Sequence, residues 1–306
     1  MTAAATLAAQ APVVARRRRP GLAGWSYLLP LLLVVGVWIY LPVLATVVLS
    51  LLDWNLTSPT AEFVGLDNLR RLLSEPEFAQ AAGQTLLYAV ALLPFSTAVP
   101  LLLAVLLWAR PGRASTIYRS LLFVPAMVAP VAVAVAWRFL LNPLNGLVNE
   151  VTGRVGLPAV NWLGDPAWAL PVIVVVTAAR VVAFNMLLFS AALSGLDRRA
   201  VEAARLEGAT GFEVVWFVVL PQLRSTTVLL GLLSVVLAGQ WSFTNVSVLT
   251  QGGPDGVTDN VYHRIHTLGF GYFETGMAST ASVLVLVFFA LAALAAEAVR
   301  RRRGRS

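Results

Sequence analysis

The sequence predicts an all-α integral membrane protein with six transmembrane helices. Hydrophobic residues fill 58% of the 306 positions and charged residues only 12%, and the mean hydropathy is +0.78. A soluble domain carries about 25% charged residues, so this chain is too apolar to cover itself with polar surface. Long charge-free stretches recur along the chain. The basic residues gather in every second one of the segments that connect these stretches.

Six charge-poor stretches define the predicted spans, because about 20 apolar residues cross the hydrocarbon core of a bilayer. Five of them run for 18 to 33 residues without a charge. The sixth, between Asp165 and Asp197, is interrupted only by Arg180. The predicted helices cover roughly residues 24–52, 84–108, 117–140, 168–194, 224–250 and 276–299.

The chain is predicted to form a single membrane domain between two short tails. Four consecutive arginines at 16–19 precede the first apolar run, an order that also begins a signal peptide. A signal peptide has an apolar core of about 7–15 residues, and this run is roughly twice as long, so we interpret it as a retained span. The predicted boundaries are 1–23 for the N-terminal tail, 24–299 for the six-helix domain and 300–306 for the basic C-terminal tail.

The arginines predict the orientation of the chain in the membrane. With the N-terminus inside, 16 of the 22 basic residues fall in cytoplasmic segments, and the outer loops hold only Arg70, Arg71, Arg154 and Arg264. Cytoplasmic loops of membrane proteins carry such an excess. We therefore predict a multi-pass membrane protein with both termini in the cytoplasm. The absence of lysine and the abundance of alanine, arginine and valine indicate a GC-rich bacterium, and so the bacterial inner (plasma) membrane. The net charge of +7 is attributed to this bias and to contact with membrane lipid, not to nucleic acid.

Missing residue types exclude several kinds of chemistry. All 22 basic residues are arginine, so the chain has no lysine for a Walker A phosphate loop or for a Schiff base. It has no cysteine, and it contains neither HExxH nor GxSxG. We predict that this chain is not an enzyme and has no metal site. If ATP drives transport here, the ATPase must be another polypeptide.

Two features lie in the predicted outer loops. The longest loop, about 53–83, carries EFVGLDNLRRLL, in which we expect a short interfacial helix. His263 and His266 share a later loop at i,i+3, where no thiol or obvious acid completes a metal site. We interpret them as ordinary loop histidines.

The predicted cytoplasmic loop at 195–222 contains a charged, interrupted helix. Asp197 is placed to cap a short helix through RRAVEAARLE, and Gly208 to end it in the left-handed conformation. Thr210 and Glu213 form a T-x-x-E capping box that begins a second, apolar helix running to Pro221. The expected structure is a helix, a sharp corner and another helix at the membrane surface.

This loop has two interpretations from its residues. Cytoplasmic loops often contain amphipathic helices that rest on lipid. However, Ala203 and Ala204 beside Glu202 form a small face suited to close protein contact, whereas lipid binding favours bulky apolar groups. A docking role is the preferred interpretation.

The same residues resemble the "EAA" motif of permease subunits in binding-protein-dependent ABC importers. The motif fits without a gap at Glu202, Ala203, Ala204, Gly208, Val218, Leu220 and Pro221. EFVGLDNL at 62–69, NWLGDPAWAL at 161–170 and LTQGGP at 249–254 are similar to stretches of the carbohydrate-uptake permeases of the maltose and glycerol-phosphate type. The resemblance covers nearly all of the chain from about residue 25.

The resemblance implies a type I ABC importer permease fold and a set of partners. These are a second homologous permease subunit, two ATPase subunits that hold the ATP and Mg²⁺, and an extracytoplasmic solute-binding protein. Glu202, Ala203, Ala204 and Gly208 then belong to the coupling helix and its corner. Two departures bear on the substrate: Phe243-Thr244 stands where Phe-Asp is usual, and Ala178-Ala179-Arg180 where a tryptophan is usual.

Polar residues within the spans are candidates for the substrate pathway. Arg180 lies near mid-bilayer, where arginine costs roughly 2.5–3.5 kcal/mol, so it must face a pathway, a partner chain or a carboxylate. Sugars need hydroxyl partners and an aromatic face, and one cluster on the fifth span offers both; helix–helix hydrogen bonding is the alternative. This cluster consists of Gln240, Trp241, Ser242, Thr244 and Asn245. Asn185 on the fourth span is a weaker candidate.

The sequence thus predicts a permease subunit of an ATP-driven sugar importer. The alternative is an ion-coupled secondary transporter of a small solute. Such a transporter ordinarily places carboxylates within its spans, and the charge-free stretches contain none.

Overall fold

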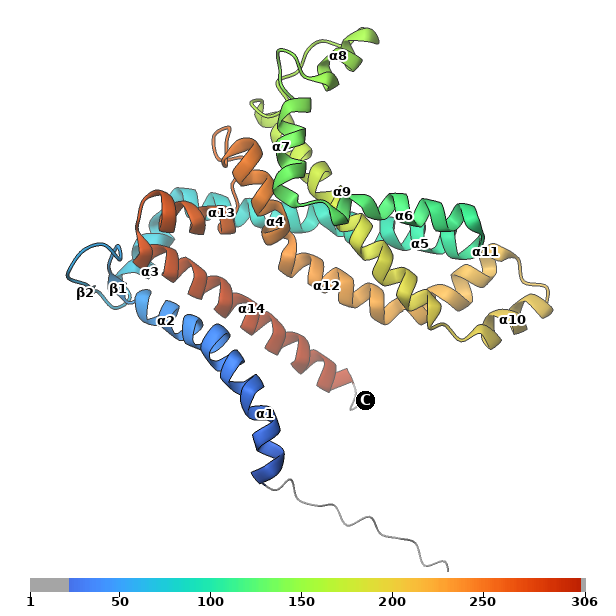
Figure 1. Ribbon diagram of the computed structural model, residues 1–306, viewed down its shortest axis with the longest axis horizontal. Helices are drawn as coiled ribbons and strands as arrows, with labels where there is room; N and C mark the ends of the chain where they lie inside the picture. Colours follow the sequence, from blue (N-terminus) through green and yellow to red (C-terminus); the bar gives the residue numbers. More distant parts are fainter. Residues whose placement is uncertain (1–21, 304–306) are drawn as a thin grey trace, which may run out of the picture. The chain divides into compact units, whose positions relative to one another are not determined.

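The computed structural model describes residues 22–303, which are mostly helical (Figure 1). The predicted tails at 1–23 and 300–306 therefore lie partly outside the described residues. The chain divides into two compact units, one reaching to Val48 and one beginning at Leu49. Each unit is described by itself.

The first unit is one long apolar helix with a local change of winding. It contains α1 (Leu22–Val35), the π-helical segment η1 (Gly36–Tyr40) and α2 (Leu41–Leu49) except for the last residue of α2, which is assigned to the second unit. Residues Tyr27–Leu49 are long and apolar enough to cross a membrane. The first predicted span is confirmed as a helix, although it ends three residues before the predicted boundary at 52.

The second unit begins with a small hairpin and a short helix. Strand β1 (Leu52–Asp53) pairs antiparallel with β2 (Glu62–Phe63) and is followed by α3 (Asp67–Ser74). A helix is therefore confirmed within EFVGLDNLRRLL, although Glu62 and Phe63 at the start of this stretch form strand β2. Asn68 holds the hairpin to α3, because its side-chain amide donates to the carbonyls of Ser50 and Leu52 at 3.1 and 3.0 Å.

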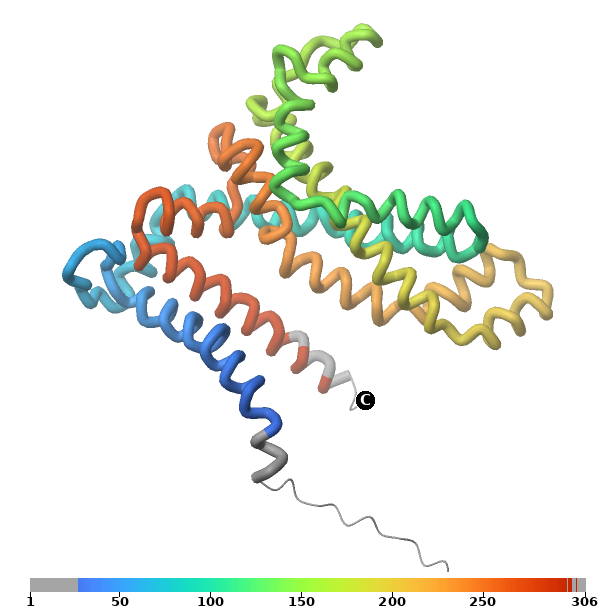
Figure 2. The backbone as a smooth tube through the Cα atoms, in the orientation of Figure 1, coloured from blue at the N-terminus to red at the C-terminus, as the bar shows by residue number. Residues whose placement is uncertain are grey.

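The remaining elements of the second unit are helical (Figures 1 and 2). In chain order they are α4 (Pro76–Ser96), α5 (Ala98–Ala109), α6 (Arg113–Met127), α7 (Pro130–Leu140), α8 (Leu147–Arg154), α9 (Pro166–Ser194), α10 (Arg198–Leu206), α11 (Gly211–Glu213), η2 (Val214–Val219), α12 (Leu220–Asn245), η3 (Val246–Thr250), α13 (Val261–His266), η4 (Thr267–Gly271) and α14 (Thr275–Arg303).

Five helices among the described residues are long and apolar enough to span a membrane, and a bent pair makes a sixth. The pair corrects the prediction of a single helix over 117–140, because α6 and α7 meet at 92°. Val128 and Ala129 are extended between them, with ψ of 141° and 130°. Proline disfavours helical backbone in the residue before it, so Pro130 explains the bend.

The fifth span also differs from its prediction. The sequence indicated a helix that runs to Pro221 and a span that begins near 224. In the structure one helix runs from Gly211 to Thr250, with the π-helical η2 directly before α12. Local π-helical turns are one way in which a helix accommodates the missing N–H of a proline such as Pro221.

Helices α4, α9 and α12 form the centre of the second unit. They pack against one another, and α9 also packs against α5 and α6. Buried apolar side chains form three clusters, one at the centre, one near the 195–222 loop and one between α3, α4, α13 and α14. The central cluster includes Tyr88, Leu92, Ile173 and Val246.

A polar contact explains how α4 and α5 are joined. The helix is interrupted at Thr97, and the carbonyl of Ser96 would next accept from residue 100, which is a proline without an N–H. Asn185 of α9 replaces that donor, because its Nδ2 donates to the Ser96 carbonyl at 2.8 Å. Asn185 is buried there and fixes α9 against the α4–α5 junction.

Candidate functional site

The loop at 195–222, here called the elbow, has the local structure that its sequence predicted. The Asp197 carboxylate accepts from the Arg199 N–H at 3.0 Å and caps α10. Gly208 has φ of +88° and lies between α10 and the next helix. The Thr210 N–H donates to Glu213 Oε2 at 2.7 Å, and the Glu213 N–H donates to Thr210 Oγ1 at 3.3 Å, which completes the capping box.

The elbow is held against the ends of α9 and α12. Val201, Val214 and Val219 are buried in one cluster with Phe189 and Leu223. At the base of the elbow, the Asp197 N–H donates to Gln222 Oε1 at 3.2 Å. The two helices of the elbow are therefore packed onto the spans that they connect, so a force on the elbow acts directly on α9 and α12.

The predicted docking residues of the elbow are divided between two surfaces. Glu202, Ala203 and Gly208 are exposed. Ala204 is half-buried and packs against the cluster that holds the elbow, because it lies three residues after buried Val201. The exposed small face is thus narrower than the sequence indicated.

Exposed apolar side chains on the elbow were not predicted. Leu206 is 89% exposed, and Phe212, Trp216 and Phe217 are also exposed. The rings of Phe212 and Trp216 stack at 6.0 Å between centroids. The i,i+4 spacing of these two aromatics was the available signal in the sequence.

A cavity of about 340 Å³ lies among α6, α7, α9 and α12, and we call it the helix cavity. It brings together three of the predicted pathway residues, Arg180, Trp241 and Asn245. Asn245 Nδ2 donates to Thr177 Oγ1 at 2.8 Å across α12 and α9. Arg180 lies at the middle of the 29-residue α9 and provides the one charged group in the lining.

The other four predicted pathway residues do not line the helix cavity. Asn185 is buried against Ser96 as described above. The Ser242 hydroxyl donates to the Ala238 carbonyl at 2.9 Å and accepts from Asn260 Nδ2 at 3.1 Å, so it packs a loop against α12. Gln240 is exposed and Thr244 is half-buried, and neither is part of this lining.

Several residues that complete the cavity were not predicted from the sequence. Thr177 lies three positions before Arg180 on the same face of α9, and that spacing was a usable signal. Phe123 of α6 and Phe184 of α9 add aromatic faces. Phe123 was out of reach, because its place in the lining depends on the bend between α6 and α7.

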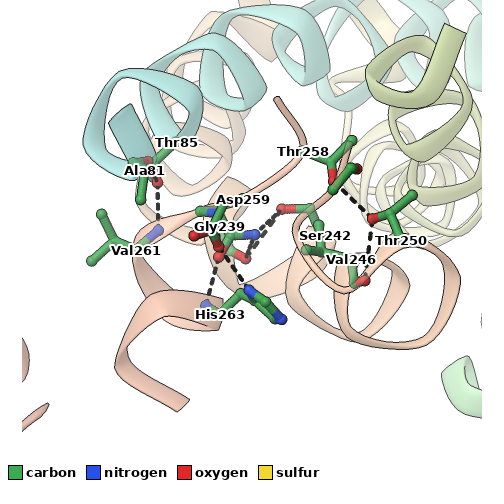
Figure 3. Close-up of polar contacts among 12 residues, drawn as sticks. Ala81, Thr85, Gly239, Ser242, Val246, Thr250, Thr258, Asp259, Val261 and His263 are labelled. Atoms are coloured by element: carbon green, nitrogen blue, oxygen red, sulfur yellow. Dashed lines mark hydrogen bonds and ion pairs between the residues drawn. The ribbon is translucent and has the colours of Figure 1, made fainter. Parts of the chain in front are cut away.

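His263 and His266, which were interpreted from the sequence as loop histidines, lie in helix α13. His263 is buried, and its Nδ1 lies 2.7 Å from Asp259 Oδ1, so it has the acid partner that the sequence analysis did not find (Figure 3). Asp259 precedes His263 by four residues, a separation that one helical turn closes. His266 is exposed, in contact with the rings of Phe243 and Phe270.

The structure is similar to a solved transporter. The crystal structure of a bacterial ABC transporter involved in the import of the acidic polysaccharide alginate contains a chain that matches with a TM-score of 0.80 and 22% identity. The match covers 92% of this chain and 96% of that one. The fold is therefore the type I permease fold of a multi-pass membrane protein.

Sequence comparisons then show the family. The chain belongs to the binding-protein-dependent transport system inner membrane components, whose family model matches residues 101–305. It is 29% identical to the lactose transport system permease protein of Rhizobium radiobacter, over 92% of this chain and 95% of that protein. It is 30% identical to the sn-glycerol-3-phosphate transport system permease protein of Pectobacterium atrosepticum, over 74% of this chain and 77% of that protein.

Proposed function

We propose that this chain is one of two permease subunits of an ATP-driven sugar importer. The elbow carries the proposal: a capped helix, a left-handed corner at Gly208 and exposed Glu202, packed onto two spans of a type I permease fold. The names of its relatives support the substrate class, since one transports lactose and another sn-glycerol-3-phosphate.

The elbow acts as a mechanical link to a separate motor. Two ATPase subunits, which hold the ATP and Mg²⁺, bind the elbows of the two permeases through Glu202 and Ala203. Gly208 sets the corner, and Ala204 anchors α10 to the spans. Because the elbow is packed on α9 and α12, closure of the ATPases moves both helices and changes access to the pathway. This chain performs no covalent chemistry and requires no cofactor of its own.

The helix cavity is part of the substrate pathway in this proposal. Arg180 offers five N–H donors to hydroxyl groups, Trp241 an aromatic face, and Asn245 an amide. An arginine in the middle of a span costs free energy unless it faces water or a partner, and the cavity provides such surroundings. The proposed pathway therefore contains fewer residues than the sequence predicted, because four candidates do not line the helix cavity. They are Asn185, Gln240, Ser242 and Thr244.

The arginine bias supports an orientation with both termini in the cytoplasm. The elbow then lies on the cytoplasmic side, where ATP is available, and α13 lies on the outer side, where a solute-binding protein delivers the substrate. The matched alginate transporter was also solved in complex with a periplasmic protein bound to an alginate pentasaccharide.

Crosslinking tests the link. The chain has no cysteine, so Ala203→Cys adds a single reactive thiol to the elbow. We expect a crosslinker with one thiol-reactive and one amine-reactive end to join it to an amine of an ATPase subunit in native membranes, and Glu62→Cys on the hairpin to give no such product. In vesicles, uptake should require ATP and persist with an uncoupler. Loss of uptake with the uncoupler, without any crosslink, indicates the ion-coupled alternative.

A further inference from the structure

A second and larger hollow lies away from the helix cavity, and the proposed pathway does not use it. It has a volume of about 770 Å³ and lies between the start of α4, η3, the loop at 251–260, α13 and η4. We call it the loop groove. Pockets for small ligands have volumes of about 300–1,000 Å³. The loop groove is therefore large enough for a disaccharide.

The lining of the loop groove combines hydrogen-bonding groups with aromatic faces. Asp255 provides a carboxylate, and Gln80 provides an amide whose Nε2 already donates to the Asp255 backbone carbonyl at 2.8 Å. Phe270 and Tyr272 provide exposed rings. Sugar hydroxyls bind to carboxylates and amides, while the C–H face of a sugar packs on an aromatic ring. His266 adds an imidazole that lies 5.2 Å from the Phe270 ring, measured between ring centroids.

Two buried polar atoms in this lining lack hydrogen-bond partners among the described residues. They are Ser247 Oγ and Arg264 Nε. Such groups are nearly always satisfied in folded proteins, so each one requires an explanation. Because both atoms are shielded from solvent, Ser247 and Arg264 must turn toward the groove before a ligand hydroxyl group can become their partner.

Side-chain hydrogen bonds hold the loop at 251–260 in place, among them the contact between Thr250 and Thr258 (Figure 3). The Thr258 hydroxyl donates to the Gly253 carbonyl at 2.7 Å and lies 2.7 Å from Thr250 Oγ1. The Thr258 carbonyl accepts from the Tyr88 hydroxyl of α4 at 3.0 Å. Asn260 accepts from the His263 N–H at 2.9 Å. A preformed site binds without the cost of ordering its own loop.

The charges of the loop groove select between ligands. Three carboxylates line it, those of Glu77, Asp255 and Asp259, against the single guanidinium of Arg264. That guanidinium already lies 3.3 Å from Glu75 and 3.9 Å from Glu77, and Asp259 is paired with His263. An anion in the loop groove would lie close to the Asp255 carboxylate, and this lining offers no unpaired guanidinium to neutralise the two negative charges. Like charges in close contact are unfavourable.

We propose that the loop groove is a second sugar-binding site, on the outer side of the chain, that accepts neutral polyhydroxylated solutes and rejects anionic ones. The proposal rests on the proposed function, because the outer side is assigned by it. Of the solutes of the relatives, lactose fits this site, whereas sn-glycerol-3-phosphate and the acidic polysaccharide alginate do not.

Protection from thiol labelling tests the site without transport. The full transporter complex, in lipid nanodiscs without ATP or binding protein, carries Gln80→Cys as the only cysteine of this chain. Lactose, maltose and trehalose are the neutral probes, and sn-glycerol-3-phosphate is the anionic probe. With a neutral probe at about ten times its dissociation constant, the labelling rate should fall about tenfold, because only free sites react. Glu62→Cys, exposed on the hairpin, is the matched control and should react at an unchanged rate.

The specificity is tested by Asp255→Asn. This variant should keep protection by the neutral probes and gain protection by sn-glycerol-3-phosphate. The proposal is overturned if no neutral probe protects Gln80→Cys, or if Glu62→Cys is protected equally. Because labelling needs no ATP, ATP-dependent uptake with an unprotected groove overturns this inference alone. Protection without ATP-dependent uptake overturns the proposed function alone.

Discussion

At the scale of single residues, Arg180 combines a permanent charge with a position in the middle of a long apolar helix. We predict that Arg180→Ala lowers uptake about tenfold or more, because a hydrogen bond to a charged group contributes about 1.5–3 kcal/mol. Assembly with the other subunits should be unchanged, as measured by copurification from the membrane.

The conservative variant Arg180→Lys separates charge from shape. It keeps the charge but loses the planar set of five donors, so uptake should lie between that of the wild type and that of Arg180→Ala. If Arg180→Ala instead prevents copurification while the remaining complexes transport at the normal rate, the residue belongs to a subunit interface.

Gly208 and Gly211 form a natural pair for a test of the elbow. A Cβ at either position meets no atom within 4 Å, but only Gly208 has a left-handed backbone, with φ of +88°. Gly208→Ala should therefore cost about 1–2 kcal/mol in the elbow, whereas Gly211→Ala should cost nothing. The measurement is ATP-dependent uptake per assembled complex, expected to fall several-fold for the first variant only. Equal effects of both variants would contradict this account.

Residues whose roles depend on near neighbours were predicted correctly from the sequence. Asp197, Gly208 and the Thr210–Glu213 box act within three or four positions, so spacing alone identifies them. Asn185 and Ser242 act on partners far away in the chain, and their type gave no information on which neighbour they would meet. Only three of the seven pathway candidates, Arg180, Trp241 and Asn245, line one cavity. The sequence could not separate them from the other four, because a place in the lining depends on how α9 and α12 pack.

At the scale of elements, the α4–α5 junction depends on a donor from another helix. Asn185→Ala removes the hydrogen bond to the Ser96 carbonyl, which Pro100 cannot replace. An unsatisfied buried carbonyl costs about 1–3 kcal/mol. We predict a lower thermal unfolding temperature for the complex, with unchanged selectivity among sugars.

A double-mutant cycle identifies the mechanism. Pro100→Ala restores a backbone N–H four residues after Ser96, so Asn185→Ala should cost less in that background. We expect a coupling of about 1 kcal/mol or more, within the range found for residues that share one hydrogen-bond network. Additive effects of the two substitutions would show that Asn185 stabilises the junction in some other way.

The helices were predicted from the length of the apolar stretches, whereas their bends and π-helical turns were not predicted. The bend between α6 and α7 follows from Pro130, a residue that was visible in the sequence but was placed within a span. Conversely, Pro221 was taken as a helix end, yet the chain continues through it after a π-helical turn. The residue before the proline differs between the two places: Ala129 before Pro130 is extended, with ψ of 130°, whereas Leu220 before Pro221 is helical, with ψ of −41°.

At the scale of the whole molecule, the composition was sufficient to predict the class, because 12% charge cannot cover a soluble domain of this size. The spans followed from the same excess of apolar residues. How the helices contact one another did not, because apolar residues on all sides of a span give no preferred face. The loop groove shows this clearly, since its lining comes from segments as distant in the chain as Glu77 and Tyr272.

The orientation of the whole chain is the last property that the sequence predicts, and it decides on which side each proposed site acts. A membrane-impermeant thiol reagent tests it, because the absence of cysteine leaves no background labelling of this chain. Ala114→Cys, at the start of α6 on the predicted cytoplasmic side and outside the proposed ATPase contact, should react only when the reagent is added to inside-out vesicles. Glu62→Cys should react only when it is added to intact spheroplasts. Both side chains are exposed, so accessibility of the side chain itself is matched. The reverse pattern would place the elbow away from cytoplasmic ATP and the loop groove away from the solute-binding protein. The arginine bias would then have been misread, and both proposals would fail together.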